Sequence, residues 1–176
     1  MDDLELRRAI KEVAYLEGDF VLRSGRRSTH YFDKYRFETQ PELLRVIGER
    51  ISAEVRQHAD GATRLAGPAL GAVALAAAAS LASGLPFVIV RDEAKGYGTA
   101  NRLEGAFEAG ETVCLVEDVV TSGGAAVSAV EALREAGLRC DTAVCVVDRE
   151  EGGVDELARH AVRLRPLFTA TDVLSA

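Results

Sequence analysis

The chain has 176 residues, which is enough for one compact domain with a sizeable hydrophobic core. Its formal net charge is −7 with a pI of about 5.1, which argues against general nucleic-acid binding because that affinity depends on clustered cations. No window is long and apolar enough to span a membrane, and the acidic N-terminus is unlike a secretory signal, so we expect a cytoplasmic protein without nucleic-acid or membrane partners. Cys114, Cys140 and Cys145 fall in or beside apolar runs and are expected to be buried, reduced thiols.

The N-terminal forty residues predict a helix followed by a hairpin. Residues 3–17 place apolar side chains on one helical face after an acidic first turn. Two short strand-like runs, 20–22 and 30–35, flank a turn dense in cations and small residues. The second run contains the adjacent aromatic residues Tyr31 and Phe32. Taken alone, an aromatic hairpin is more often a cover over the core than a platform for a ligand.

Alternating helices and strands occupy the middle of the chain. Residues 41–57 predict a helix that begins at a proline, a residue favoured in the first helical turn. A strand at 64–66, a glycine-containing turn and an Ala-rich helix ending near Gly84 follow, and 86–91 is the next buried strand. Residues 92–111 show little apolar periodicity, and a loop of this length inside a compact domain is usually functional or disordered.

The most informative stretch runs from Val113 to Ala126. It opens as a strand buried on both faces, continues with Glu117 and Asp118, and turns through Thr-Ser-Gly-Gly into a helical pattern. Unpaired N–H groups at a helix N-terminus, together with glycines and hydroxyl donors, form an anion site. Two acids beside a phosphate would repel it, so we expect them to hold ribose hydroxyls or a bridging magnesium ion. The alternative, a purely structural turn with acids at an exposed strand end, is less favoured because acids, hydroxyls and glycines occur together.

The C-terminal part repeats the alternation. Arg149 follows a strand predicted at 142–147, which places it on the ligand edge of an open α/β sheet. The alternative for Arg149 is a surface arginine paired to Glu150. Strands alternating with helices predict a doubly wound α/β domain with a mainly parallel sheet. A short helix, an apolar run and a closing turn complete the domain, at 154–160, 162–164 and 171–172.

These motifs carry a family resemblance. The stretch 113–126 resembles the phosphoribosyl-diphosphate (PRPP) signature of type I phosphoribosyltransferases: an apolar strand, two acids, two apolar residues and a Thr-rich glycine loop. Residues 20–35, FVLRSGRRSTHYFDKY, resemble the N-terminal segment of orotate phosphoribosyltransferases, which forms a hood over the base. Residues 91–105 resemble the catalytic loop of that family, with Asp92 at a usual Lys and Tyr97 at a usual His.

The resemblance covers nearly the whole chain and implies the type I phosphoribosyltransferase fold with a small N-terminal hood. It implies one domain, 1–176, with the hood at about 1–40, the core at about 41–176 and a mobile catalytic loop at about 92–105. The implied reaction transfers the 5-phosphoribosyl group from PRPP to orotate and gives orotidine 5′-monophosphate and diphosphate, a step of pyrimidine (UMP) biosynthesis. Mg²⁺ is the implied cofactor. The implied assembly is a homodimer whose loop is shared across subunits.

Site residues follow from the same resemblance. Catalytic roles are implied for Lys95, Glu117 and Asp118. Contacts to PRPP are implied for two segments: Arg91, Lys95, Tyr97, Glu117, Asp118, Val119, Val120, Thr121, Ser122, Gly123, Gly124 and Ala125. Contacts to orotate are implied for Tyr31, Phe32, Thr121 and Arg149. Magnesium is expected to bind through PRPP, with Asp118 as a candidate side-chain contact, and Arg23 stands where bacterial members often carry a Lys near the phosphates.

Two alternative functions stay open on the sequence. One is a phosphoribosyltransferase for another base, against which the hood aromatics and Arg149 argue. The other is a non-catalytic, PRPP-sensing regulator of transcription built on the same domain. The acidic charge, the lack of a helix-turn-helix segment and the presence of Lys95 argue against that regulator.

Overall fold

A six-stranded sheet forms the centre of the computed structural model, which describes residues 1–21, 25, 27–92 and 102–176. The strand order is β5-β4-β3-β6-β7-β8, and every neighbouring pair is parallel except β4 and β5. The strands are β3 Arg64–Pro68, β4 Phe87–Val90, β5 Leu103–Glu104, β6 Thr112–Val120, β7 Arg139–Asp148 and β8 Arg163–Thr169. The predicted doubly wound, mainly parallel architecture is confirmed.

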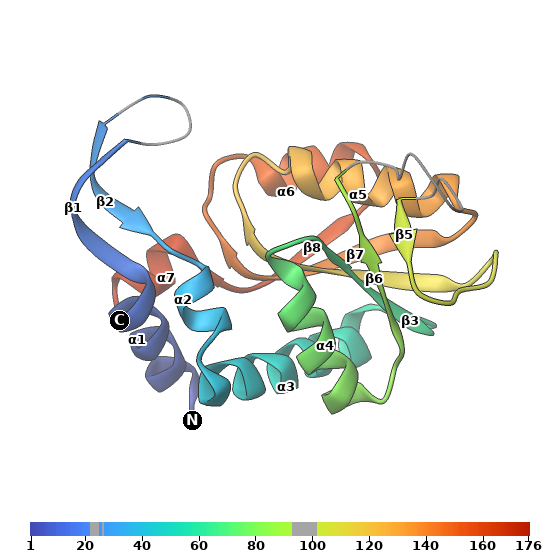
Figure 1. Cartoon of the computed structure of the whole chain (residues 1–176), viewed down its shortest axis with the longest axis horizontal. Coiled ribbons are helices and arrows are strands. Elements are labelled where there is room, and N and C mark those ends of the chain that lie inside the picture. Colours follow the sequence, from blue (N-terminus) through green and yellow to red (C-terminus); the bar gives the residue numbers. More distant parts are fainter. Residues whose placement is uncertain (22–24, 26, 93–101) are drawn as a thin grey trace.

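Helices cover both faces of this sheet (Figure 1). On one face lie α3 (Pro41–His58) and α4 (Ala72–Ser83), and on the other lie α5 (Gly124–Glu135) and α6 (Gly153–Arg159). Successive side chains of a strand point to opposite faces, so alternate β6 residues enter different cores. Cys114 and Val116 belong to the core beneath α3 and α4, whereas Val113 and Leu115 belong to the core beneath α5. This double burial explains the continuous apolar run that identified the strand.

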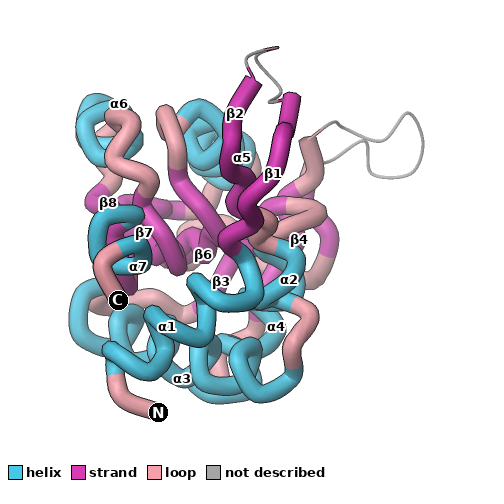
Figure 2. Tube along the Cα trace, turned by 90° about the vertical axis from the view of Figure 1, so that its left-hand side faces the viewer, coloured by secondary structure: helices cyan, strands magenta, loops and turns pink. Residues whose placement is uncertain are grey.

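The N-terminal hood consists of α1 (Asp3–Ala14), a hairpin of β1 (Tyr15–Val21) and β2 (Arg27–Phe32), and the short helix α2 (Tyr35–Glu38). Figure 2 shows the hairpin projecting from the body of the domain. The prediction of a helix through residue 17 is wrong, because Tyr15 takes an extended backbone and pairs with Phe32. The second strand-like run, predicted through residue 35, ends as a strand at Phe32, and α2 was not predicted.

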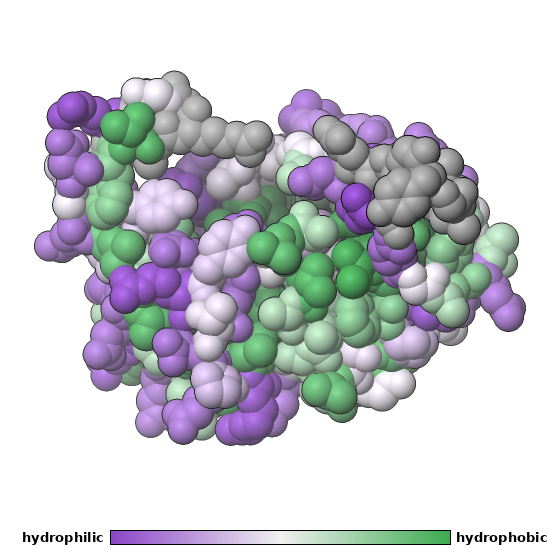
Figure 3. All heavy atoms as spheres, viewed as in Figure 1, coloured by the Kyte–Doolittle hydropathy of each residue, from purple (hydrophilic) through white to green (hydrophobic). Residues whose placement is uncertain are grey.

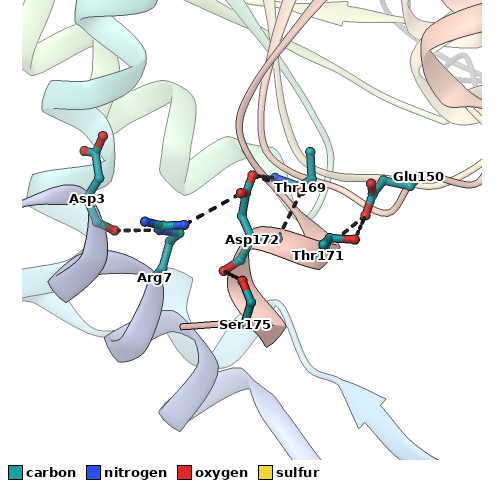
Figure 4. Close-up of polar contacts among 7 residues, drawn as sticks. All are labelled: Asp3, Arg7, Glu150, Thr169, Thr171, Asp172 and Ser175. Carbon is teal, nitrogen blue, oxygen red and sulfur yellow. Dashed lines mark hydrogen bonds and ion pairs between the residues drawn. The ribbon is translucent and has the colours of Figure 1, made fainter.

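The C-terminus closes against the hood (Figure 4). The predicted closing turn is a short helix, α7 (Ala170–Leu174), whose N-terminus is capped reciprocally by Thr169 and Asp172. Arg7 of α1 lies 3.6 Å from the carboxylate of Asp172. The carboxylate of Glu150, in the loop after β7, accepts hydrogen bonds from the Thr171 N–H at 2.9 Å and hydroxyl at 2.6 Å. The end of β7 is therefore fixed to both chain ends.

Several predicted boundaries need correction. β7 begins three residues earlier than expected, at Arg139, and extends to Asp148. The segment 92–111 is not a continuous loop, since Leu103 and Glu104 form β5 and pair antiparallel with β4. The three cysteines are buried and free, as expected. Among the helices of the described part of the chain, none has the length and apolarity to cross a membrane.

Candidate active site

A cleft opens where the sheet changes its winding direction. β3 and β6 are parallel neighbours, but the helices that follow them, α4 and α5, lie on opposite faces of the sheet. Ligands of open α/β sheets bind at the carboxyl ends of strands at such a switch point. This switch-point cleft brings together four of the predicted site residues, which are Arg91, Glu117, Asp118 and Ala125.

The acidic pair at the end of β6 is buried, with Glu117 7% and Asp118 2% exposed. Burial, followed by the neighbouring charge of Asp118, raises the pKa of Glu117 to about 8. The Glu117 Oε1 atom has no hydrogen-bond partner in the described structure. Buried polar atoms are nearly always paired in proteins, so an unpaired oxygen at a cleft marks a place for a ligand donor. A ribose hydroxyl has the required chemistry.

Two further charged residues reach this pair from α2. The Lys34 ammonium lies 2.5 Å from Asp118 Oδ2, and Glu38 is 3% exposed with its Oε1 unpaired among the described residues. Burial, then the charge of Asp118, raises the pKa of Glu38 to about 8. Burial alone would lower the pKa of Lys34, but the hydrogen bond and charge of Asp118 outweigh it and raise the pKa. Sequence reasoning gave neither residue a role; the rarity of lysine in this chain was the available signal.

The turn between β6 and α5 presents an uncapped helix N-terminus. Gly123 takes a left-handed conformation, φ 86°, and no side chain caps the N–H groups that follow it. A Cβ at Gly123 would lie 3.1 Å from the carbonyl oxygen of Gly153, whereas one at Gly124 would meet nothing within 4 Å. Packing therefore explains Gly123 and leaves Gly124 unexplained. The side chains of Val119 and Val120 belong to the two cores, so only their backbone is available to a ligand.

The base of the predicted catalytic loop is held at the cleft. The Arg91 N–H donates to the Arg102 carbonyl at 2.8 Å, and the Arg102 Nε–H donates to the Arg91 carbonyl at 3.0 Å. The Arg102 guanidinium also donates to the carbonyl and hydroxyl oxygens of Ser128 on α5. Arg91 pairs with Glu104 at 3.3 Å. Lys95 and Tyr97 lie outside the described residues, as does Arg23.

A second cavity lies between the hood and the end of β7. Its lining brings together Tyr31, Phe32 and Arg149, as predicted for an orotate site. It also includes residues that sequence reasoning missed, namely Tyr15, His30, Val147, Glu151, Ala170, Val173 and Leu174. The Arg149 guanidinium lies 2.9 Å from Glu151, so the alternative pairing with Glu150 is wrong because Glu150 is bound to Thr171. Thr121 lines neither this hood cavity nor the switch-point cleft.

Comparison with known proteins agrees with this arrangement. The family model for the phosphoribosyl transferase domain matches residues 36–165. The orotate phosphoribosyltransferase of Methanocella arvoryzae is 49% identical over 98% of this chain and 97% of its own. That of Halobacterium salinarum is 51% identical over 90% of this chain and 89% of its own. The chain is a member of the orotate phosphoribosyltransferase family.

Solved structures of orotate phosphoribosyltransferases share the fold. The Aeropyrum pernix structure superposes with a TM-score of 0.84 at 35% identity, covering 97% of this chain and 96% of that one. A Mycobacterium tuberculosis structure in complex with PRPP superposes with a TM-score of 0.82 at 27% identity, covering 98% and 99%. The predicted fold family is thus confirmed over nearly the whole chain.

The two glycines of the turn should separate stability from ligand binding in this phosphoribosyltransferase. We expect Gly123→Ala to lower the free energy of unfolding by about 1–3 kcal/mol, because it forces a left-handed alanine against Gly153. Gly124→Ala should leave stability unchanged or higher but weaken PRPP binding, because its methyl group enters open space at the uncapped N–H groups. Urea unfolding and calorimetric titration measure both, and unchanged PRPP affinity in Gly124→Ala would contradict the phosphate site.

The buried carboxyls predict a pH-dependent stability for the ligand-free protein. The pKa of Glu38 is raised from 4.5 to about 8, so between these values the folded protein keeps a proton that the unfolded chain has released. The free energy of unfolding should therefore decrease as the pH rises through this interval. Glu38→Gln should make the decrease shallower, whereas the exposed-site control Glu49→Gln should not. Urea unfolding across the interval measures the slopes, and parallel curves for Glu38→Gln and wild type would refute the assignment.

Proposed function

We propose that this protein transfers the 5-phosphoribosyl group of PRPP to orotate, forming orotidine 5′-monophosphate and diphosphate. The observation that carries the proposal is the placement of two complementary cavities at one edge of one sheet. The switch-point cleft combines an acidic pair with a helix N-terminus, and the hood cavity combines aromatic rings with Arg149. Relatives that bear the name orotate phosphoribosyltransferase support the same substrate pair.

The switch-point cleft would hold PRPP in two parts. The 5-phosphate would bind the uncapped N–H groups of α5, with hydroxyl donors from Thr121 and Ser122, because the helix dipole favours an anion there. The buried acids Glu117 and Asp118 would accept hydrogen bonds from the ribose hydroxyls. This division keeps the carboxylates on the neutral part of the substrate and away from the phosphate.

In the reaction the bond between ribose C1 and the diphosphate oxygen breaks, and its electron pair leaves with diphosphate. A new bond forms between C1 and N1 of orotate, and the proton that N1 loses passes to solvent. Catalysis then rests on positioning and on stabilising the charge that develops on the leaving group. Arg91 and Lys95 are the proposed cations for that charge, and closure of the 92–105 segment would exclude water, which otherwise hydrolyses PRPP.

Magnesium fits this site through the substrate. Among the described residues no group of three or more His, Cys, Asp or Glu side chains is arranged to hold a metal ion. The unpaired oxygen of Glu117 and the carboxylate of Asp118 nevertheless suit a water or hydroxyl carried by such an ion. We propose that Mg²⁺ is bound mainly by oxygens of PRPP, with Asp118 nearest among the side chains. The ion would supply positive charge to the diphosphate.

The hood cavity would hold orotate. The planar guanidinium of Arg149 matches a carboxylate with two parallel hydrogen bonds. Its present partner Glu151 is about half exposed, with 48% of the side chain accessible, and exposed ion pairs contribute little to stability. Replacing Glu151 by the substrate carboxylate as the partner of Arg149 therefore costs little free energy. Tyr31 and Phe32 supply ring faces and edges for the pyrimidine.

We propose a homodimer built on the outer face of α3 and α4. This apolar face, formed by Leu44, Ala74, Ala77, Ala78 and Leu81, includes a leucine that is 90% exposed. Figure 3 shows the apolar surface over α4. Leu70, in the loop between β3 and α4, is also exposed. Large exposed apolar patches mark association sites. A second copy would cover this face and bring its 92–105 segment toward the neighbouring cleft; a monomer in sedimentation experiments would exclude it.

The orotate assignment predicts a selective defect in Arg149→Ala. The Michaelis constant for orotate should rise about 10- to 100-fold, the range expected for lost hydrogen bonds to a charged group, while PRPP binding stays unchanged. Glu151→Gln is the matched control, since it removes a charge beside the same guanidinium and should lower that constant slightly. Loss of orotate absorbance in the presence of PRPP and magnesium measures the rate. PRPP binding without orotate consumption by the wild type would favour another base or the regulator.

A further inference from the structure

The cationic side chains of the switch-point cleft differ in how free they are to bind an anionic substrate. The segment 68–72, which contains the β3–α4 loop, contributes backbone and apolar side chains but no charge. Among the described residues that line the cleft, the cations are Lys34, Arg91 and Arg102. Arg102 is already bound to the Arg91 carbonyl and to Ser128 on α5. Its role is to fix the base of the loop, and a polyanionic substrate must be met by the others.

Lys34 reaches into the centre of the cleft from the hood. It stands at the N-terminus of α2, and its ammonium lies 2.5 Å from Asp118 Oδ2. A Cβ built on Gly71 would overlap Asp118 Oδ2 and lie 2.9 Å from the same ammonium, so the ion pair lies directly against the backbone of the β3–α4 loop. The side chain of Lys34 is 35% exposed and is part of the lining of the cleft.

An ammonium group has three N–H donors, and its hydrogen bond with Asp118 accounts for one. The ammonium also lies 5.5 Å from the centroid of the Tyr35 ring, and because Lys34 lines the cleft, a ligand there can accept from the remaining donors. An anion entering there would pass close to Asp118, whose carboxylate repels it. A lysine already bound to the acid offsets that repulsion and offers hydrogen bonds to the anion, without any movement of α2.

We propose that Lys34 is a further substrate-binding residue, which stays bound to Asp118 and donates hydrogen bonds to the diphosphate of PRPP. The inference rests on the proposed function and adds to it a cation that the sequence motifs did not assign. Because negative charge grows on diphosphate as the C1–O bond breaks, a fixed ammonium beside it stabilises the leaving group. Lys34 exchanges no proton in this role.

The position of Lys34 in the chain also links the switch-point cleft to the hood cavity. It follows Phe32, which lines the hood cavity, and only Asp33 separates the two. The Asp33 N–H donates to the Ala14 carbonyl at 2.8 Å, which fixes this connection to the end of α1. One short, anchored segment thus supplies a ring to the base and a charge to the diphosphate, and it sets the spacing between the two substrates.

Lys34→Gln tests the proposal by binding rather than by turnover. Inorganic diphosphate and PRPP, each with magnesium, should bind about tenfold more weakly or worse, as expected for a lost charged hydrogen bond. Orotidine 5′-monophosphate lacks diphosphate and should bind with nearly unchanged affinity. Lys34→Arg should recover part of the diphosphate affinity. Arg27→Gln is the control, because it removes one charge from an exposed ion pair with Asp19 in the same hood.

Two results would overturn the proposal. One is unchanged diphosphate affinity in Lys34→Gln. The other is an equal loss of affinity for diphosphate and for the nucleotide, which would indicate a purely structural ion pair with Asp118. A wild type that binds neither PRPP nor the nucleotide would instead refute the proposed function itself.

A second measurement uses the unaltered protein in case Lys34→Gln does not fold. The chain has only three lysines, Lys11, Lys34 and Lys95, so acetylation of each can be followed by mass spectrometry. Inorganic diphosphate with magnesium should slow the acetylation of Lys34. Lys11, which donates to the carbonyls of Leu174 and Ala176, is the internal control and should react at an unchanged rate. Equal rates for Lys34 with and without diphosphate would contradict the contact.

Discussion

Two adjacent carboxyl groups are buried at the end of the central strand, and the architecture around the cleft depends on how they are accommodated. Removing a carboxylate from water is unfavourable unless it is paired or protonated. Asp118 is paired with Lys34, whereas Glu117 keeps an oxygen without a partner among the described residues. A packing role would be met better by apolar residues. In the proposed function, the ribose hydroxyls of PRPP are the donors that complete the hydrogen bonding of the pair.

The two cavities are connected through short, well-defined contacts. The Arg149 N–H donates to the Val120 carbonyl at 2.9 Å, which fixes this arginine of the hood cavity against the strand that carries the acidic pair. Glu150 binds Thr171 of α7, and α7 in turn contacts α1 through Asp172 and Arg7. The hood is therefore joined to the C-terminal helix α7 and, through Glu150, to the end of β7. Such anchoring holds the binding groups near their working geometry, which is what a reaction driven by positioning requires.

Local patterns predicted the parts of the fold that local interactions determine. The sequence predicted β6, the turn after it and α5, because the apolar run, the glycines and the helical periodicity that define them follow one another directly in the chain. The short helix α2 was not predicted, because its four residues carry no periodic pattern and its contacts are distant in sequence, with Phe37 in the core and Glu38 beside Asp118. The end of α1 at Ala14 was also missed, since cross-strand pairing of Tyr15 with Phe32 overrides its helical pattern.

In the candidate site, too, the sequence predicted some residues and missed those that depend on contacts between distant parts of the chain. Tyr31, Phe32 and Arg149 were assigned by resemblance, and the fold brings them to one cavity. Tyr15 and His30, which stack with ring centroids 5.6 Å apart, joined that cavity only through hairpin register, which the sequence does not reveal. Lys34 needed the three-dimensional placement of Asp118. Residues whose role arises from packing across the chain remained invisible until the fold was known.

Glu117→Gln, measured for unfolding free energy with and without PRPP and magnesium, tests most directly whether the acidic pair is kept for substrate. The substitution removes a buried ionisable group whose pKa is raised to about 8 and keeps the side-chain shape. We expect a ligand-free variant that is at least as stable as the wild type near neutral pH, and a smaller stabilisation by PRPP. A protein that loses stability without ligand yet gains as much from PRPP as the wild type would contradict this expectation.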